Sequence, residues 1–193
     1  MRTDMHSFSE KLKFFGAFIR SPKTIGSVIP TSSRVISHIL DQIDWKAARL
    51  IVEYGPGMGT ITQPILERLH PDARLIAIDM NAGFINHLKL SIPDPRLVAV
   101  HGSAADVGRI IANHIAGGRA DYIVSGLPFS TLPEGIDNHI MSETARALTP
   151  EGAFLVYQYS RYVVPLLRTH FTSVDEAKIW RNIPPCYIFR ATK

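Results

Sequence analysis

The chain has 193 residues, of which 46% are apolar and 20% are charged, enough for one well-buried domain and short for two. Its single cysteine, Cys186, excludes an internal disulfide and favours a reducing, cytoplasmic compartment. The longest apolar runs fall short of the ~18 to 20 residues that span a bilayer, and we find no signal-peptide pattern, so we expect neither an integral membrane protein nor a secreted one.

The net charge of +4 is concentrated near the N-terminus. Residues 1–40 contain six basic and two acidic side chains, whereas residues 41–193 contain fifteen of each sign. In residues 5–20 the spacing of four apolar side chains predicts an amphipathic helix, with three basic residues off the apolar stripe. The stripe is Phe8, Leu12, Phe15 and Ile19, and the basic residues are Lys11, Lys13 and Arg20.

A Pro-, Gly- and Ser-rich connector follows at residues 21–33. Ser32 or Ser33 can cap the N-terminus of a second helix, whose apolar stripe begins at Val35 and ends at Ile43. We therefore divide the chain into an N-terminal helix with its connector, residues 1–33, and one domain, residues 34–193.

The rest of the chain alternates between two patterns. Runs rich in β-formers at about 50–54, 74–79, 96–100, 120–125 and 153–159 are separated by helical patterns at about 60–69, 81–91, 104–117 and 134–148. This rhythm predicts an α/β fold with a doubly wound, mostly parallel sheet. Two further strands are expected at 174–181 and 186–191. Because the link between them is too short for a helical crossover, they should pair antiparallel.

The first strand runs into a glycine loop. Glu53 is followed by Gly55, Gly57 and Gly59, so that backbone rather than side chains can face a nucleotide-like ligand. Asp79 ends the next strand, where an acid can accept both hydroxyls of a ribose. The spacing G-x-G-x-G differs from the dinucleotide fingerprint G-x-G-x-x-G. Thr60 occupies the position of the third glycine of that fingerprint, which lets the helix pack closely.

These motifs, with Gly102-Ser103-Ala104 and Ser125-Gly126-Leu127-Pro128-Phe129 after the third and fourth strands, resemble those of class I S-adenosylmethionine-dependent methyltransferases. The resemblance implies a Rossmann-like, seven-stranded sheet with an antiparallel last strand. It implies that Asp79 holds the ribose and that Met80, Ser103 and Ala104 flank the adenine. The glycine loop would face the methionine part, and Ser32, Ser125, Leu127 and Pro128 would complete the cofactor site. The family usually has an acid or Asn where Ser103 stands.

Two narrower resemblances point to different substrates. The fourth-strand motif is similar to the Asn-Leu-Pro-Tyr type of the ribosomal RNA adenine dimethyltransferases, with Gly126 in place of Asn and Phe129 in place of Tyr. Losing the Asn amide weakens base recognition. Residues 14–33 resemble the N-terminal region of the soluble type of bacterial phospholipid N-methyltransferases. That resemblance implies stepwise methylation of phosphatidylethanolamine to phosphatidylcholine.

Methyl transfer from a sulfonium is an in-line displacement, for which we expect no metal. An ammonium has a pKa of about 10, so a carboxylate, Tyr or His must accept a proton, directly or through water. The face of an aromatic ring also attracts a cation, here the ammonium of the acceptor or the sulfonium of the methyl donor. We predict Ser125, Phe129, Tyr157 and Tyr159 as catalytic residues. The two tyrosines are two positions apart on one strand and therefore face the same side of the sheet, so both could instead pack under a helix.

The sequence thus predicts a phospholipid N-methyltransferase held peripherally at the cytoplasmic face of the inner membrane by its N-terminal helix. We expect a monomer that binds no nucleic acid. The same helix could instead cover the sheet or roof the active site. The alternatives are an RNA (adenine-N6) or small-molecule methyltransferase and, from another class, a noncatalytic membrane-associated protein that binds the cofactor.

Overall fold

The computed structural model describes residues 32–180 and 185–193. The predicted helix at 5–20, and with it Phe8, Lys11, Leu12, Lys13, Phe15, Ile19 and Arg20, lies outside the described residues, as does the connector up to residue 31. Within the described part, no helix is both long and apolar enough to cross a bilayer.

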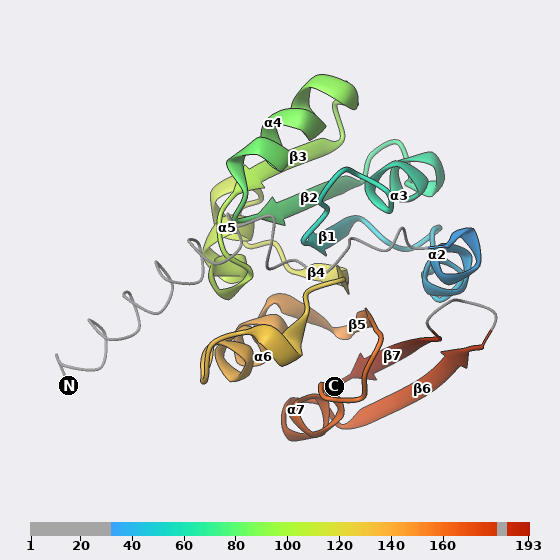
Figure 1. The fold of residues 1–193 in the computed structure, drawn as a ribbon. Helices are drawn as coiled ribbons and strands as arrows, with labels where there is room; N and C mark the ends of the chain where they lie inside the picture. Colours follow the sequence, from blue (N-terminus) through green and yellow to red (C-terminus); the bar gives the residue numbers. More distant parts are fainter. Residues whose placement is uncertain (1–31, 181–184) are drawn as a thin grey trace, which may run out of the picture.

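The described chain alternates strands and helices (Figure 1). The strands are β1 (Leu50–Tyr54), β2 (Arg74–Asp79), β3 (Leu97–His101), β4 (Ala120–Ser125), β5 (Leu148–Gln158), β6 (Ser173–Ile179) and β7 (Cys186–Thr192). The helices are α2 (Ser33–Leu40), α3 (Thr62–Arg68), α4 (Ala82–Ser91), α5 (Val107–His114), α6 (Ile136–Ala147) and α7 (Val164–His170), with 3-10 turns η1 (Ala104–Asp106) and η2 (Phe129–Thr131).

The seven strands form one sheet in the order β3-β2-β1-β4-β5-β7-β6. All neighbouring pairs from β3 to β5 are parallel, and β7 runs antiparallel to both β5 and β6. The predicted α/β class, the mostly parallel sheet and the antiparallel last strand are confirmed. Because β6 is antiparallel to β7, it points the same way as β5, so both strands end at one edge of the sheet.

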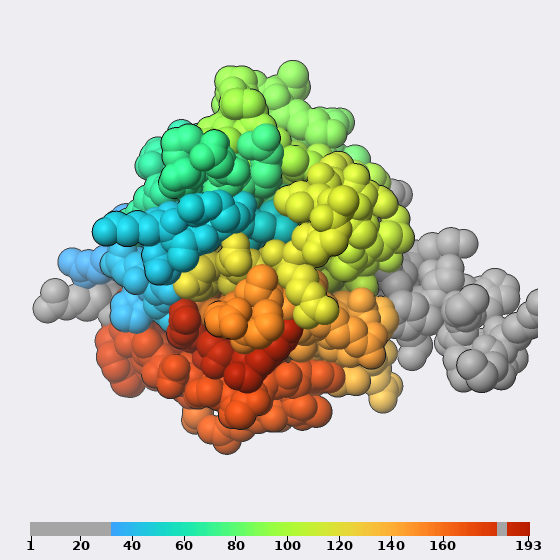
Figure 2. Space-filling view, turned by 180° about the vertical axis from the view of Figure 1, so that it is seen from behind, coloured from blue at the N-terminus to red at the C-terminus, as the bar shows by residue number. Residues whose placement is uncertain are grey.

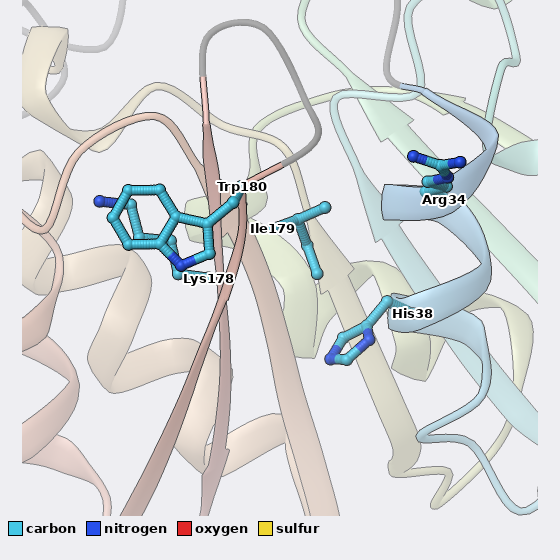
Figure 3. Close-up of a pocket in the computed structure, with 5 residues that line it drawn as sticks. All are labelled: Arg34, His38, Lys178, Ile179 and Trp180. Carbon is cyan, nitrogen blue, oxygen red and sulfur yellow. The ribbon is translucent and has the colours of Figure 1, made fainter.

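Helices α2, α3 and α4 cover one face of the sheet through apolar side chains such as Val35, Ile65 and Leu88. The space-filling view shows the blue start of the described chain beside its red end, where α2 contacts β7 (Figure 2). Close to the end of β6, Ile179 faces α2, with His38 on the same side (Figure 3).

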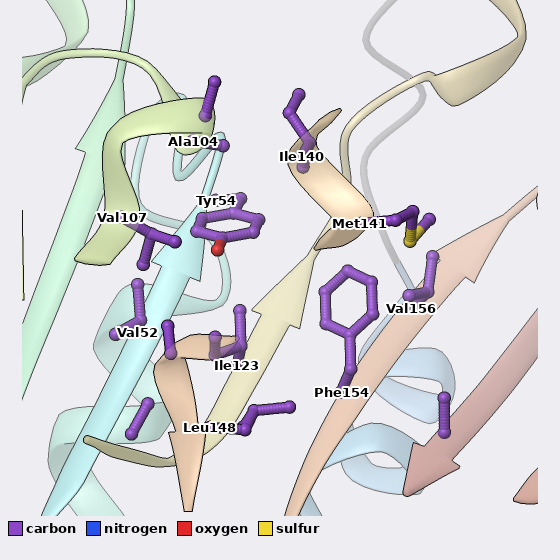
Figure 4. Close-up of a cluster of buried hydrophobic side chains, with 14 of the residues drawn as sticks. Val52, Tyr54, Ala104, Val107, Ile123, Ile140, Met141, Leu148, Phe154 and Val156 are labelled. Carbon is purple, nitrogen blue, oxygen red and sulfur yellow. The ribbon is translucent and has the colours of Figure 1, made fainter. Parts of the chain in front are cut away.

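The other face is covered by α5, α6 and α7 around a larger apolar cluster. Tyr54 of β1 and Phe154 of β5 meet edge to face at its centre, with ring centroids 6.2 Å apart. Ile140 and Met141 of α6 close over them (Figure 4). Burial of each such side chain contributes about 1.5 to 3 kcal/mol. The core therefore fixes the strand ends from which the site is built.

Two elements differ from the sequence-based expectation. Strand β5 begins at Leu148 rather than near 153, and its pairing with β4 shifts register between Ala120 and Tyr122. Helix α7 was not predicted. It is only seven residues long and carries Pro165 in its first turn, a position where proline is tolerated although it commonly signals a break.

Candidate active site

The predicted motifs meet at the carboxyl edge of three neighbouring strands. Tyr54 at the end of β1 is in register with Ile78 of β2 on one side and with Ser125 of β4 on the other. The strand order reverses between β1 and β4, and such a switch point leaves a crevice beyond the strand ends where α/β proteins bind ligands. The sheet thus places the glycine loop, Asp79 and the Ser125 loop side by side.

The glycine loop leaves β1 in a backbone conformation that favours glycine. Gly57 has φ of 54°, and, its two chain neighbours aside, no heavy atom of the described residues lies within 4 Å of where its Cβ would be. Gly59 has φ of 85°, and a Cβ there would stand 2.9 Å from the Leu88 side chain of α4. Gly57 therefore keeps an open space beside the backbone, while Gly59 lets a helix approach the loop.

Asp79 connects the end of β2 to this loop. Its carboxylate accepts hydrogen bonds from the backbone N–H of Asn81 at 2.8 Å and of Gly57 at 3.4 Å. Burial raises the pKa of the Asp79 carboxyl above its usual range, and these two N–H groups oppose the rise. The carboxylate is thus held beside the open space at Gly57, where it could accept ribose hydroxyls.

Glu53 lies at the base of the same loop and is buried. Its carboxylate accepts a hydrogen bond of 2.7 Å from the Thr62 hydroxyl, which connects β1 to the start of α3. Burial raises the pKa of Glu53 to about 7, the Thr62 bond opposes the rise, and the nearby Asp79 adds to it. Sequence reasoning missed Thr62, the first residue of α3.

The predicted adenine side lies beyond β2 and β3. Met80 packs partly buried against the larger core cluster, and its carbonyl oxygen lies 3.0 Å from Nε2 of His101. Ser103 and Ala104 are buried at the start of η1, where the Ser103 hydroxyl accepts from the backbone N–H of Ala105 at 3.2 Å. The structure thus uses Ser103 as a cap, and its contact with adenine stays a prediction.

The loop after β4 is held by two side chains. The fully buried Ser125 hydroxyl accepts from the backbone N–H of Leu127 at 3.2 Å. Gln158, at the end of β5, donates to the Leu127 carbonyl at 2.8 Å. Sequence reasoning missed Gln158, whose position directly after Tyr157 was the available signal. Ser125 therefore shapes the turn into Leu127 and Pro128, and its predicted role in catalysis stays untested.

The expectation that Phe129 would present its ring to the substrate does not fit its position. Phe129 has no exposed surface and belongs to the same buried cluster as Ile136 and Ile140 of α6. The reason is local, because after Pro128 the chain turns into η2, with the Phe129 N–H donating to the Leu127 carbonyl at 2.9 Å. That turn directs the ring into the core.

Tyr157 lies against the motif loop. A Cβ built at Gly126 would overlap the Tyr157 hydroxyl, and its three nearest atoms all belong to this tyrosine. Any side chain at position 126 would therefore displace Tyr157. The ring of Tyr157 is half-buried against the α2 and α3 side of the sheet, as the packing alternative anticipated, whereas Tyr159 beyond the strand end is exposed.

Ser32 stands at the N-cap of α2, but its side chain caps nothing. Among the residues that the structure describes, no donor or acceptor reaches its buried hydroxyl. An unpaired buried hydroxyl costs about 1 to 3 kcal/mol, which a ligand atom could offset. An unpaired hydroxyl at Ser32 is compatible with the predicted place of this residue in the cofactor site.

The residues fit S-adenosylmethionine in three respects. Gly57 leaves space for the ligand beside bare backbone, Asp79 offers two carboxylate oxygens, and Ser32 has an unpaired hydroxyl. Within the described residues, no cluster of three or more His, Cys, Asp or Glu side chains could hold a metal ion. Fold and site together define the class as a Rossmann-like methyltransferase.

Comparison with known proteins identifies the family. The model of the family described as "Methyltransferase domain" matches residues 51–152, more than half of the chain. The chain belongs to this methyltransferase family and is an S-adenosylmethionine-dependent enzyme. A solved structure, precorrin-6y C5,15-methyltransferase from Geobacter metallireducens, superposes with a TM-score of 0.67 at 16% identity, covering 86% of this chain and 92% of that one. This likeness concerns the fold.

Two curated relatives differ in how much of them is matched. An ornithine lipid N-methyltransferase from Singulisphaera acidiphila is 29% identical over 188 residues, covering 93% of this chain and 95% of the relative. A ribosomal RNA small subunit methyltransferase A from Geobacter metallireducens is 28% identical over 116 residues, covering 60% of this chain but only 41% of the relative. The resemblance to ribosomal RNA methyltransferases is thus present, and the lipid relative, which matches over nearly its whole length, is named for an ornithine lipid rather than a phospholipid.

Proposed function

We propose that this enzyme methylates the amine of a membrane lipid, with phosphatidylethanolamine and its methylated derivatives as substrates and phosphatidylcholine as the final product. The observation that carries the proposal is the Tyr157 hydroxyl against Gly126. This packing leaves no room for the Asn that the ribosomal RNA enzymes have at position 126. The near full-length likeness to a lipid N-methyltransferase supports the same conclusion.

The chemistry requires little covalent participation by the protein. When bound, S-adenosylmethionine would supply a methyl group on a positively charged sulfur, and the amine nitrogen would take this methyl in an in-line displacement that leaves the C–S electron pair on sulfur. Asp79 and the glycine loop hold S-adenosylmethionine in place, and Ser125 and Gln158 fix the loop that faces the lipid amine. The ammonium proton leaves to a base or to water before the nitrogen attacks.

Tyr157 contributes in two ways under this proposal. Its hydroxyl replaces the amide of the RNA enzymes as the polar group at Gly126, and its ring offers a face to an alkyl ammonium. Tyr159, exposed beyond β5, offers a second aromatic face at the same edge. Phe129 is left out of this set because its ring is buried in the core.

The test uses labelled S-adenosylmethionine and vesicles that contain phosphatidylethanolamine. We expect labelled mono-, di- and trimethylated lipid on thin-layer chromatography, with activity lost in Tyr157→Ala. Label in ribosomal RNA and none in lipid would falsify the proposal.

A second candidate substrate is an ornithine lipid, because the relative that matches nearly the whole chain is named for it. Both lipids present a primary ammonium on a flexible chain, so the described residues serve either. Vesicles containing one lipid or the other, compared at equal concentration, decide between them through kcat/KM.

A further inference from the structure

Most of the exposed large apolar side chains of the described residues follow the carboxyl ends of strands. Five such residues stand out by their exposed fractions: Met58 56%, Tyr159 41%, Tyr162 50%, Trp180 71% and Leu90 85%. Met58 follows β1, Tyr159 and Tyr162 follow β5, and Trp180 follows β6. Because these strands are parallel in the sheet, four of the five residues follow the carboxyl ends of strands.

Leu90 is the exception and serves as the reference. Helix α4 starts beside Asp79 at the carboxyl edge and returns to the start of β3, so Leu90 near its end lies at the opposite edge. Scattered single apolar residues are ordinary on protein surfaces, whereas a group at one edge indicates an interaction surface.

Trp180 is paired with a cation. The Lys178 ammonium lies 3.7 Å from the centroid of the Trp180 ring and 4.8 Å from that of Tyr187. Lys178 and Trp180 project from the same side of β6, as the close-up shows (Figure 3). An indole next to an ammonium combines the two chemistries that suit the headgroup region of a bilayer.

The surface around Trp180 is open and positively charged. A groove of about 510 Å³ at the end of β6 is lined by Arg34 and His38 of α2 and by Lys178, Ile179 and Trp180. No carboxylate is among these lining residues of the described chain. Nearby, Glu176 of β6 is neutralised by Arg161 through an ion pair of 2.8 Å, which also anchors the segment that carries Tyr162. The charge of the groove therefore complements an anionic partner.

We propose that the Trp180 surface, made of Trp180, Lys178, Ile179, Arg34 and His38, docks on an anionic phospholipid bilayer. This inference rests on the proposed function, since a lipid substrate held in a bilayer must reach the carboxyl edge. The indole ring enters the headgroup layer, and the Lys178 and Arg34 cations contact lipid phosphates.

The chain allows a direct test because it has two tryptophans, Trp45 and Trp180. In the variant Trp45→Phe, all indole fluorescence comes from Trp180. Adding anionic vesicles should shift this emission to shorter wavelength and protect it severalfold from acrylamide quenching. Should Trp45→Phe fail to fold, since Trp45 donates a hydrogen bond to the Leu40 carbonyl, the difference between wild type and Trp180→Phe reports the same quantity.

Matched variants measure the contribution to binding. We expect Trp180→Ala to lower vesicle binding about tenfold, because partial burial of one large aromatic ring accounts for a factor of that order. Lys178→Gln should lower binding to anionic vesicles and leave binding to vesicles without net charge unchanged. Leu90→Ala, which removes a more exposed apolar side chain from the opposite edge, should leave binding unchanged.

The outcomes separate this inference from the proposed function. If the protein sediments with vesicles and methylates their lipid while the Trp180 emission stays unchanged, the Trp180 surface is not the contact and the inference is wrong. A shift produced by RNA but not by vesicles also overturns it. If lipid dispersed in detergent is not methylated while the vesicle-induced shift persists, the docking surface stands and the proposed function fails.

Discussion

The two halves of the site are built in different ways. In the cofactor half, from β1 to β3, each functional residue lies within a short sequence motif. Backbone groups position these side chains, as when the Gly57 N–H donates to the Asp79 carboxylate. In the proposed acceptor half, the decisive contact joins Gly126, in the loop after β4, to Tyr157 of β5. The cofactor half follows rules that a sequence displays locally, whereas the acceptor half depends on a tertiary fit.

The largest effect is expected in the cofactor half. Asp79→Ala removes both carboxylate oxygens, and hydrogen bonds to a charged group contribute about 1.5 to 3 kcal/mol each. We expect S-adenosylhomocysteine to bind about a hundredfold more weakly or worse by isothermal titration calorimetry. The control is Asp72→Ala, an exposed acid in the turn before β2. Equal affinities in the two variants would remove Asp79 from the cofactor site.

In the acceptor half, adding one methyl group should be enough to disturb the site. Gly126→Ala introduces a Cβ that overlaps Tyr157, so we expect the free energy of unfolding to fall by about 1 to 3 kcal/mol and activity to fall with it. Chemical denaturation measures the first quantity. The matched control, Gly108→Ala, places its Cβ at an ordinary contact distance of 3.8 Å from Glu143.

A double-mutant cycle shows whether Tyr157 is the cause. In a Tyr157→Ala background, the cost of Gly126→Ala should largely vanish, since the overlapping atoms are gone. An undiminished cost would mean that something other than this pair excludes side chains at position 126.

Stability should depend on pH through Glu53. Its pKa is about 7 in the folded protein against 4.5 ordinarily, so between these values the unfolded chain ionises first and stability is lost as pH rises. Glu53→Gln removes this loss, and we expect up to about 3 kcal/mol greater stability at pH 8, shrinking towards zero near pH 4.5. Denaturation of the ligand-free protein across this range measures it. Glu67→Gln, an exposed acid on α3, should show no such trend.

The smallest effect concerns Ser32. Its hydroxyl has no partner within the described residues, so Ser32→Ala removes an unpaired buried group and should raise the free energy of unfolding of the ligand-free protein by about 1 kcal/mol. If a ligand atom pairs with this hydroxyl, cofactor affinity should fall about fivefold. Ser33→Ala, one residue further along α2, controls for effects on the helix start. A loss of stability without loss of affinity would assign Ser32 a structural part only.

Much of the fold could be predicted from the sequence because strands buried on both faces appear as short apolar runs. β1 and β2 have the predicted bounds, and the closeness of β6 to β7 in the chain settled their antiparallel pairing. What failed depended on tertiary context. The loop after Pro128 folds inward as η2, which buries Phe129, and the seven-residue α7 has too few apolar positions to show a period.

The site divides in the same way. Glu53, Asp79 and Ser125 were predicted from their motifs, and the sheet brings them together at one edge. Gln158 was missed although it directly follows Tyr157, and the fit between Gly126 and Tyr157 could not be predicted, since it depends on β5 lying beside the motif loop at one particular register.

The account's central claim is that the acceptor half admits a lipid amine in place of a nucleobase. A competition in one tube tests it most directly: the enzyme and labelled S-adenosylmethionine, with vesicles containing phosphatidylethanolamine and with ribosomal RNA at equal molar concentration of acceptor groups. We predict label in the lipid and none above background in the RNA. Label that enters the RNA in preference to the lipid would contradict the account.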